Sequence, residues 1–135
     1  MFEELQILII RVLIVVLALL ILLGGIFLCG RYGWKIQGFW SCEVPQINNV
    51  AVADGYVYID GTHIGVPPKG FMGYLSDEIP GEVHIGLRFD GFFGIFEDNN
   101  FSISVPVDSQ ITKVYLVDST GSHLIWTEEK GLIKN

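Results

Sequence analysis

Hydrophobic positions divide the chain into one continuous apolar run near the N-terminus and a longer region of short alternating patterns. Residues 7–29 read ILIIRVLIVVLALLILLGGIFLC, with a single charge at Arg11. As a helix this run would be about 34 Å long, slightly more than the roughly 30 Å of a bilayer's hydrocarbon core. It is longer than the apolar part of a secretory signal and has no small-residue cleavage site. We therefore expect a transmembrane anchor over residues 1–30 and a separate domain over residues 31–135.

The anchor should have a membrane-spanning part and an interfacial part. Arg11 lies near one boundary, where its long stem can carry the charge to the headgroups. Aromatic and basic side chains favour the interface, so the residues that follow the run are expected there. The expected spanning residues include Ile7, Arg11, Val12, Leu23 and Cys29, and the expected interfacial residues are Arg31, Tyr32, Trp34 and Lys35.

The charges flanking the anchor predict its orientation. Glu3, Glu4 and Arg11 lie on the N-terminal side, whereas two basic residues, Arg31 and Lys35, lie on the C-terminal side. By the positive-inside rule this places the larger domain on the cytosolic side, by a margin of one charge. Cys42 has no evident partner outside the apolar run, which also suits a reducing compartment. A glycosylation sequon at residues 100–102 would matter only in the opposite orientation.

The region beyond residue 38 shows the alternation and turn signals of short strands. Glu82–Phe89 alternates most clearly, with Val83, Ile85, Leu87 and Phe89 on one face. Asp54-Gly55 is a signal for a two-residue hairpin. We predict an all-β fold, a small antiparallel β-sandwich or barrel of about eight strands. The segments expected to form strands are 38–44, 50–53, 56–60, 70–75, 82–89, 92–97, 101–107, 111–117 and 123–127.

Charge and composition exclude several classes of function. The chain has 8 Lys and Arg against 15 Asp and Glu, a net charge of −7, and no basic cluster. Nucleic-acid binding that depends on phosphate contacts needs the opposite sign, so we expect no nucleic-acid partner. With 2 Cys and 50% hydrophobic residues, the chain is neither a disulfide scaffold nor disordered.

The polar residues do not form a pattern that is typical of catalysis or metal binding. His63, His84 and His123 fall in three separate segments, none with a second ligand at metal-site spacing. Serines lack the G-x-S-x-G context, Cys42 lacks a nearby histidine, and no P-loop or dinucleotide motif occurs. We therefore predict no catalytic residues, no metal, no cofactor and no enzymatic activity.

Aromatic residues are numerous and have two interpretations. They can fill the core, or part of them can form a surface that docks on another molecule. Strict alternation places Tyr56 and Tyr58 opposite Val57 and Ile59, so that both faces of this hairpin carry large side chains. The candidate docking surface comprises Trp40, Pro67, Pro68, Phe92, Phe93 and Phe96.

Three short motifs carry a resemblance to a viral family. Gly38-Phe39-Trp40 with Cys42, then Gly73-Tyr74-Leu75, then Leu124-Ile125-Trp126 follow the anchor in this order. The chain thereby resembles the membrane-anchored β-domain virion proteins of large icosahedral double-stranded DNA viruses, the chloroviruses and their nucleocytoplasmic relatives. The resemblance implies a structural minor virion (minor capsid) protein that fills or bridges the space between the internal viral membrane and the capsid. Its partners would be lipid and capsid or other virion membrane proteins, with the β-domain on the cytosolic, capsid-facing side.

A weaker resemblance gives an alternative function. Calycins open with Gly-x-Trp, so Gly38-Phe39-Trp40 is also similar to the start of a lipocalin-like barrel. This resemblance implies a membrane-tethered ligand-binding or sensor domain for a small hydrophobic ligand. Trp40 and the aromatics of residues 92–96 would then line its pocket.

Overall fold

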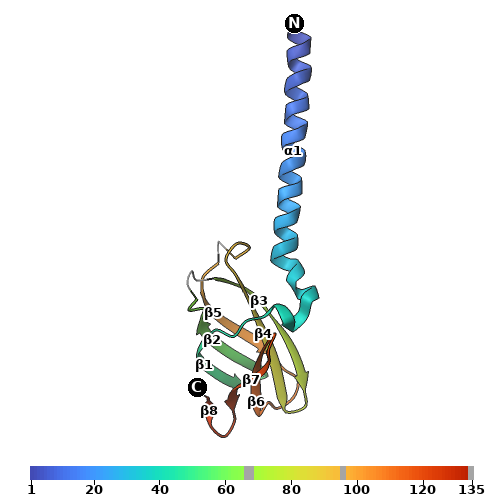
Figure 1. The fold of residues 1–135 in the computed structure, drawn as a ribbon. Helices are drawn as coiled ribbons and strands as arrows, with labels where there is room; N and C mark the ends of the chain where they lie inside the picture. The colour runs from blue at the N-terminus through green and yellow to red at the C-terminus, as the bar shows by residue number, and fades with distance from the viewer. Residues whose placement is uncertain (66–68, 95–96, 134–135) are drawn as a thin grey trace. The chain divides into compact units, whose positions relative to one another are not determined.

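The computed structural model describes residues 1–65, 69–94 and 97–133, which form two compact units, Met1–Gly33 and Trp34–Asn135. The first unit is one continuous helix, α1 (Phe2–Tyr32) (Figure 1). No residue of this helix is buried. Its length and apolar composition are sufficient to cross a membrane. The helix ends two residues beyond Gly30, and the Gly33 N–H donates to the Cys29 carbonyl at its C-terminus.

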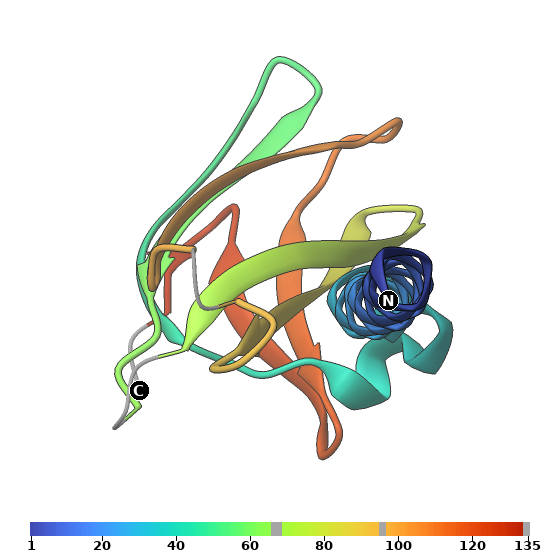
Figure 2. The ribbon, with the colours of Figure 1, turned by 90° about the horizontal axis from the view of Figure 1, so that it is seen from above.

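The second unit begins with a short 3-10 segment and continues as eight strands in two sheets (Figures 1 and 2). The smaller sheet has the order β1-β2-β5, and the larger has the order β3-β4-β6-β7-β8. The 3-10 segment is η1 (Gly33–Ser41); the strands are β1 (Gln46–Ala53), β2 (Tyr56–Thr62), β3 (Gly70–Ile79), β4 (Glu82–Asp90), β5 (Asn100–Pro106), β6 (Lys113–Asp118), β7 (Gly121–Thr127) and β8 (Gly131–Leu132).

The predicted alternation is confirmed in the strands that form the core. In β4, Val83, Ile85, Leu87 and Phe89 are fully buried. In β5 every second residue is buried, and the strand ends at Pro106 on the edge of its sheet. The two sheets thus contribute their apolar faces to one shared core, an arrangement consistent with a sandwich.

The hairpins at Asp54-Gly55 and at residues 118–121 are also confirmed, whereas the pairing is not antiparallel throughout. β4 and β6 pair in parallel, with Glu82 opposite Lys113 and Ile85 opposite Leu116. The chain leaves β4, contributes β5 to the other sheet and returns as β6 in the same direction as β4. The fold is therefore mostly, but not entirely, antiparallel.

Two predicted strands are wrong. Residues 38–44 were expected to form the first strand, but most of this stretch belongs to η1, where Gly38 interrupts the turn with φ 65° and ψ −151°. Residues 92–97 were expected to pair with β4; of the described residues in this range, 92–94 form a bend and turn and residue 97 a bend. The Asp90 carboxylate accepts the N–H groups of Phe92 and Phe93 at 2.7 and 2.9 Å, which stabilises this turn over a strand.

The hairpin between β6 and β7 gives a pH-dependent prediction. The hydroxyl of Thr120, the ring of His123 and the Thr120 N–H all bond to Asp118, and they lower the pKa of its carboxyl from 3.8 to about 2. A lowered pKa adds stability that is present above the unfolded value and is lost as pH falls through the folded value. Asp118→Asn should therefore lower the free energy of unfolding at neutral pH. The difference from wild type should shrink as pH falls from about 4 to about 2. Parallel pH profiles in denaturant melts would contradict this assignment.

Candidate functional site

The chain between the helix and the first strand packs on the outer face of the larger sheet. Trp34 lies over Gly73 of β3, where an added Cβ would be 3.3 Å from its ring. Phe39 and Cys42 lie over Gly86 of β4, where an added Cβ would be 2.6 Å from an atom of each. Two glycines on the outer face therefore make room for this segment. Cys42 follows Phe39 by three positions, a helical spacing that explains why the stretch is not a strand.

Polar contacts fasten the same segment to β4. The Arg88 guanidinium donates to the Ser41 carbonyl at 2.9 Å and pairs with Asp90 at 3.1 Å. The Glu43 N–H donates to the Leu87 carbonyl at 2.8 Å. We call residues 34–43 the collar. It is held by ring packing and by hydrogen bonds, so the chain leaving α1 enters the β-domain directly.

The residues expected at the membrane interface have different surroundings. The Arg31 guanidinium lies 5.7 Å from the centre of the Tyr32 ring, and Tyr32 is exposed. Lys35 is exposed, with its Nζ 6.0 Å from the Trp34 ring. Trp34 itself is only 3% exposed, and its ring packs above Gly73. Its location at the membrane interface stays a prediction. The expected spanning residues are all exposed on α1; they are Ile7, Arg11, Val12, Leu23 and Cys29.

The candidate docking residues fall in separate segments. Trp40, in the collar, is 68% exposed, and Phe92, in the turn after β4, is 67% exposed. Phe93 is half-buried and meets Phe92 edge to face, with ring centres 5.0 Å apart. Pro67, Pro68 and Phe96 lie outside the described residues.

The outer face of the smaller sheet is a further aromatic surface. Tyr56 and Tyr58 project from β2 and are 42% and 38% exposed, with ring centres 6.0 Å apart. Their neighbours across the sheet are small: Ala51 and Ser104 flank Tyr58, and Ala53 and Pro106 flank Tyr56. The two tyrosine rings thus project from an exposed face of the sheet on which the neighbouring side chains are small. We call this group the tyrosine face.

One polar cluster was not expected from the sequence. The Glu43 carboxylate bonds to His63 Nε2 at 3.0 Å and to Lys69 Nζ at 2.6 Å. The N–H groups of Gly65 and Lys69 point to His63 Nδ1 at 3.3 and 3.4 Å. With Nδ1 accepting, the ring proton belongs on Nε2, where it is donated to Glu43.

This cluster ties a loop to the collar and leaves the histidine no free nitrogen for chemistry. The side chain of His63 is 12% exposed and its ring lies 5.0 Å from Phe89 of the core. Both ring nitrogens are occupied, and a general base needs one that is free to take a proton. Residues 43 and 63 are 20 positions apart, so no local sequence pattern predicted that they pair. The arrangement is structural.

The other histidines also have local partners. His84 stacks on Tyr115 with ring centres 4.7 Å apart and lies 3.5 Å from Glu82. His123 bonds to Asp118 in its own hairpin. Within residues 1–65, 69–94 and 97–133, no three His, Cys, Asp or Glu side chains gather as metal ligands.

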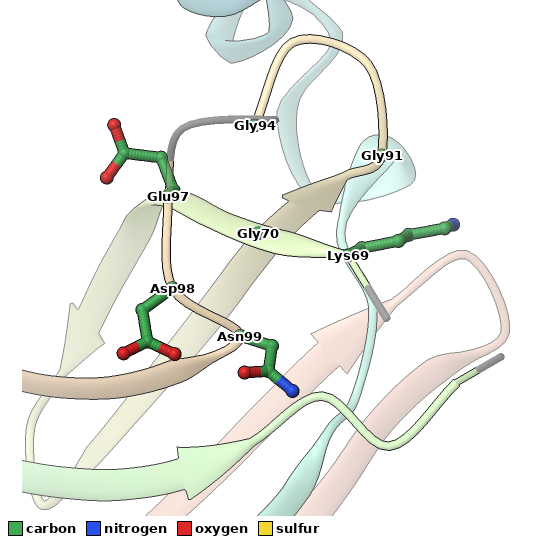
Figure 3. Close-up of a pocket in the computed structure, with 7 residues that line it drawn as sticks. All are labelled: Lys69, Gly70, Gly91, Gly94, Glu97, Asp98 and Asn99. Carbon is green, nitrogen blue, oxygen red and sulfur yellow. The ribbon is translucent and has the colours of Figure 1, made fainter. Parts of the chain in front are cut away.

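A small hollow of about 270 Å³ lies where β3 begins (Figure 3). Its charged side chains do not converge: Lys69 and Glu97 point in opposite directions, and Asp98 points away from both. Backbone of Gly70, Gly91 and Gly94 supplies much of the remaining wall. Divergent charges around a glycine-lined hollow do not make a catalytic arrangement.

A larger groove of about 690 Å³ lies beside the first residues of β1. Its walls are mainly aliphatic, and Ile64 and Val44 are 67% and 40% exposed there. Asn48 and Gln46 are its polar members. The full lining is Val44, Pro45, Gln46, Ile47, Asn48, Ile64, Ile125 and Ile133.

Burial controls the chemistry of Cys42. Desolvation raises the pKa of its thiol from 9.0 to about 11, against smaller opposing effects of Ser41 and Arg88. The thiol is therefore protonated at neutral pH and is not a nucleophile. In detergent-solubilised protein with Cys29 replaced by Ser, a maleimide should label Cys42 slowly until denaturant is added. Rapid labelling of the folded protein would show that the collar opens.

The glycine beneath Phe39 gives a stability prediction. Gly86→Ala should lower the free energy of unfolding by about 1–3 kcal/mol, because the new methyl group overlaps Phe39 and Cys42. Gly91→Ala is the matched control, since a Cβ there meets open space. Chemical denaturation of the full chain in detergent measures both. Equal effects of the two substitutions would contradict the packing of the collar.

Comparisons with protein-family models, with curated proteins and with solved structures found no match for this chain. The resemblances to virion proteins and to calycins therefore stay predictions from the sequence. The function has to be argued from the anchor helix, the collar and the surfaces of the β-domain.

Proposed function

We propose that the protein is a membrane-anchored structural protein that holds its β-domain at a bilayer and presents that domain to a neighbouring protein. The observation that carries the proposal is α1: a helix of 31 residues with no buried residue. Such a helix satisfies its own backbone hydrogen bonds, and lipid is the surrounding in which its exposed apolar side chains are stable.

The β-domain is consistent with a protein in which the helix anchors and a separate domain provides the structural surface. Within the described part of the chain, fourteen buried residues, all but Ile111 from the strands of the two sheets, form its core, and none of them belongs to α1. The domain therefore has its own source of stability, and the helix is free to serve as an anchor. With eight strands around one core, the domain is a rigid body suited to a structural role.

The connection between the two units limits how far the domain can be from the membrane. α1 ends at Tyr32, and Trp34 is already buried on β3, so only Gly33 lies between them. Three consecutive Cα atoms span at most about 8 Å. A flexible tether would allow the domain to search a large volume, whereas this connection keeps it next to the bilayer.

The surface that meets the neighbour is the tyrosine face in this proposal. Exposed tyrosines supply large contact areas at low entropic cost, and they are enriched at protein interfaces. The Phe92–Phe93 pair is the second surface. Acidic residues outnumber basic ones in the chain, so a neighbour with basic patches would be electrostatically complementary.

The finer proposal follows from the resemblance to virion proteins. We propose that the protein is a minor virion protein of the internal membrane of a large double-stranded DNA virus, with a sandwich domain facing the capsid. The short connection and the autonomous core support this role, since a spacer between membrane and shell needs a fixed shape more than a reactive site.

The second candidate is a membrane-tethered domain that binds a small hydrophobic ligand. The aliphatic groove beside β1 favours it, because ligand sites are concave, largely apolar and carry a few polar groups. The groove is open at the surface, with Ile125 of the shared core in its lining, whereas a lipocalin-like barrel encloses an interior cavity. This difference makes the structural role the better supported of the two.

Purified virus particles test the structural role. After external proteins are stripped, the protein should stay with the particle and be released only by detergent, as quantified by mass spectrometry. Crosslinks to a capsid or membrane-protein neighbour should be lost in a Tyr56→Ser, Tyr58→Ser double variant and kept in a Tyr115→Ser control. Absence from particles, together with saturable binding of a fluorescent fatty acid that Ile47→Asp abolishes, would establish the ligand-binding role instead.

A further inference from the structure

The exposed side of the collar is unusually apolar. Trp34, Phe39 and Cys42 face the sheet, while Ile36 is 92% exposed and Trp40 is 68% exposed. Isolated exposed apolar side chains are common, but Ile36 belongs to the same short segment as an exposed tryptophan. In water, these two large apolar side chains are mostly exposed to solvent.

We propose that Ile36 and Trp40 insert into the interfacial layer of the same bilayer that α1 spans, so that the collar is a second, peripheral membrane contact. This inference rests on the proposed membrane anchoring. It adds that the β-domain has a fixed orientation on the membrane, with the collar against the lipid.

Chain length brings these residues to the bilayer. Arg31 marks the end of the apolar stretch, and it follows Arg11 by 20 residues. Twenty residues of α-helix span about 30 Å, the thickness of the hydrocarbon core, so Arg31 falls at a membrane boundary. Ile36 is four residues beyond the end of α1 and can be at most about 15 Å from Tyr32. The headgroup layer is about 5–8 Å thick on each side, so the collar starts within reach of it.

The charge of the collar also suits a lipid surface. Lys35 is the one charged side chain between Tyr32 and Glu43, in a chain whose net charge is −7. It is exposed beside Ile36. A lysine next to an isoleucine and a tryptophan is the composition of interfacial segments, in which aromatic rings lie at headgroup depth and cations meet anionic lipids.

The collar is rigid enough for such contacts to orient the domain. Ring packing on Gly73 and Gly86 and the Arg88–Ser41 hydrogen bond fix it to β3 and β4. Insertion of Ile36 and Trp40 would then restrain the whole β-domain. The tyrosine face, on the other sheet, would stay available to a neighbour.

The experiment uses the full chain reconstituted into phosphatidylcholine vesicles, with and without phosphatidylserine. Tryptophan fluorescence is quenched by lipids that carry bromine on their acyl chains, and separately by acrylamide in the water. The contribution of Trp40 is the difference between wild type and Trp40→Phe. We expect this component to be blue-shifted, quenched by the brominated lipid and protected from acrylamide. Trp126→Phe is the control that should leave the quenched component in place.

A second pair of variants separates insertion from simple proximity. Ile36→Ser should shift the equilibrium away from the inserted state by about tenfold, because it removes an apolar side chain from the lipid contact. Ile79→Ser alters another exposed isoleucine, at the end of β3, and should leave the Trp40 signal unchanged. Anionic lipid should strengthen insertion in wild type but not in Lys35→Gln.

Carbonate extraction of the same vesicles distinguishes the two proposals. Protein that resists extraction while its Trp40 is quenched by acrylamide and not by brominated lipid would overturn the collar inference and leave the anchoring intact. Protein that carbonate removes would overturn the anchoring, and the collar inference with it. Resistance to extraction with lipid quenching of Trp40 supports both.

Discussion

The close approach of the collar to the outer face of the larger sheet is the contact on which the rest of this structure depends. It is possible only because Gly73 and Gly86 present no side chain beneath Trp34 and Phe39. Through it, the residues that follow α1 become part of the β-domain without a linker. Gly33 alone lies between the end of α1 at Tyr32 and the first buried residue of the β-domain, Trp34.

The shared core explains why the collar can pack on the outside without disturbing the fold. The buried faces of β2, β4 and β5 close on each other, and the collar covers part of the opposite face of β4. The Glu43–His63–Lys69 cluster then joins the end of the collar to the chain after β2. One short segment of the β-domain is thus connected to both sheets.

The same arrangement divides the surface of the domain by role. The collar exposes Ile36, Lys35 and Trp40, while the tyrosine face exposes two rings on the smaller sheet. In the functions proposed here, the first surface meets lipid and the second meets a protein.

The sequence by itself determined the long apolar helix, the mostly β character and the core faces, because these depend on local periodicity: a long apolar run, and alternation such as that of Val83 to Phe89. It also suggested strands at residues 38–44 and 92–97, because both segments are rich in aromatic residues, which favour strands. Only the tertiary structure decided that Trp34 is buried, that Trp40 is exposed and that β4 pairs in parallel with β6. These outcomes depend on contacts between residues that are distant in the chain, such as Trp34 with Gly73, Phe39 with Gly86 and Glu43 with His63. A glycine in a strand indicates that another part of the chain packs closely against the strand at that position. Which residue packs there is decided only by the tertiary structure.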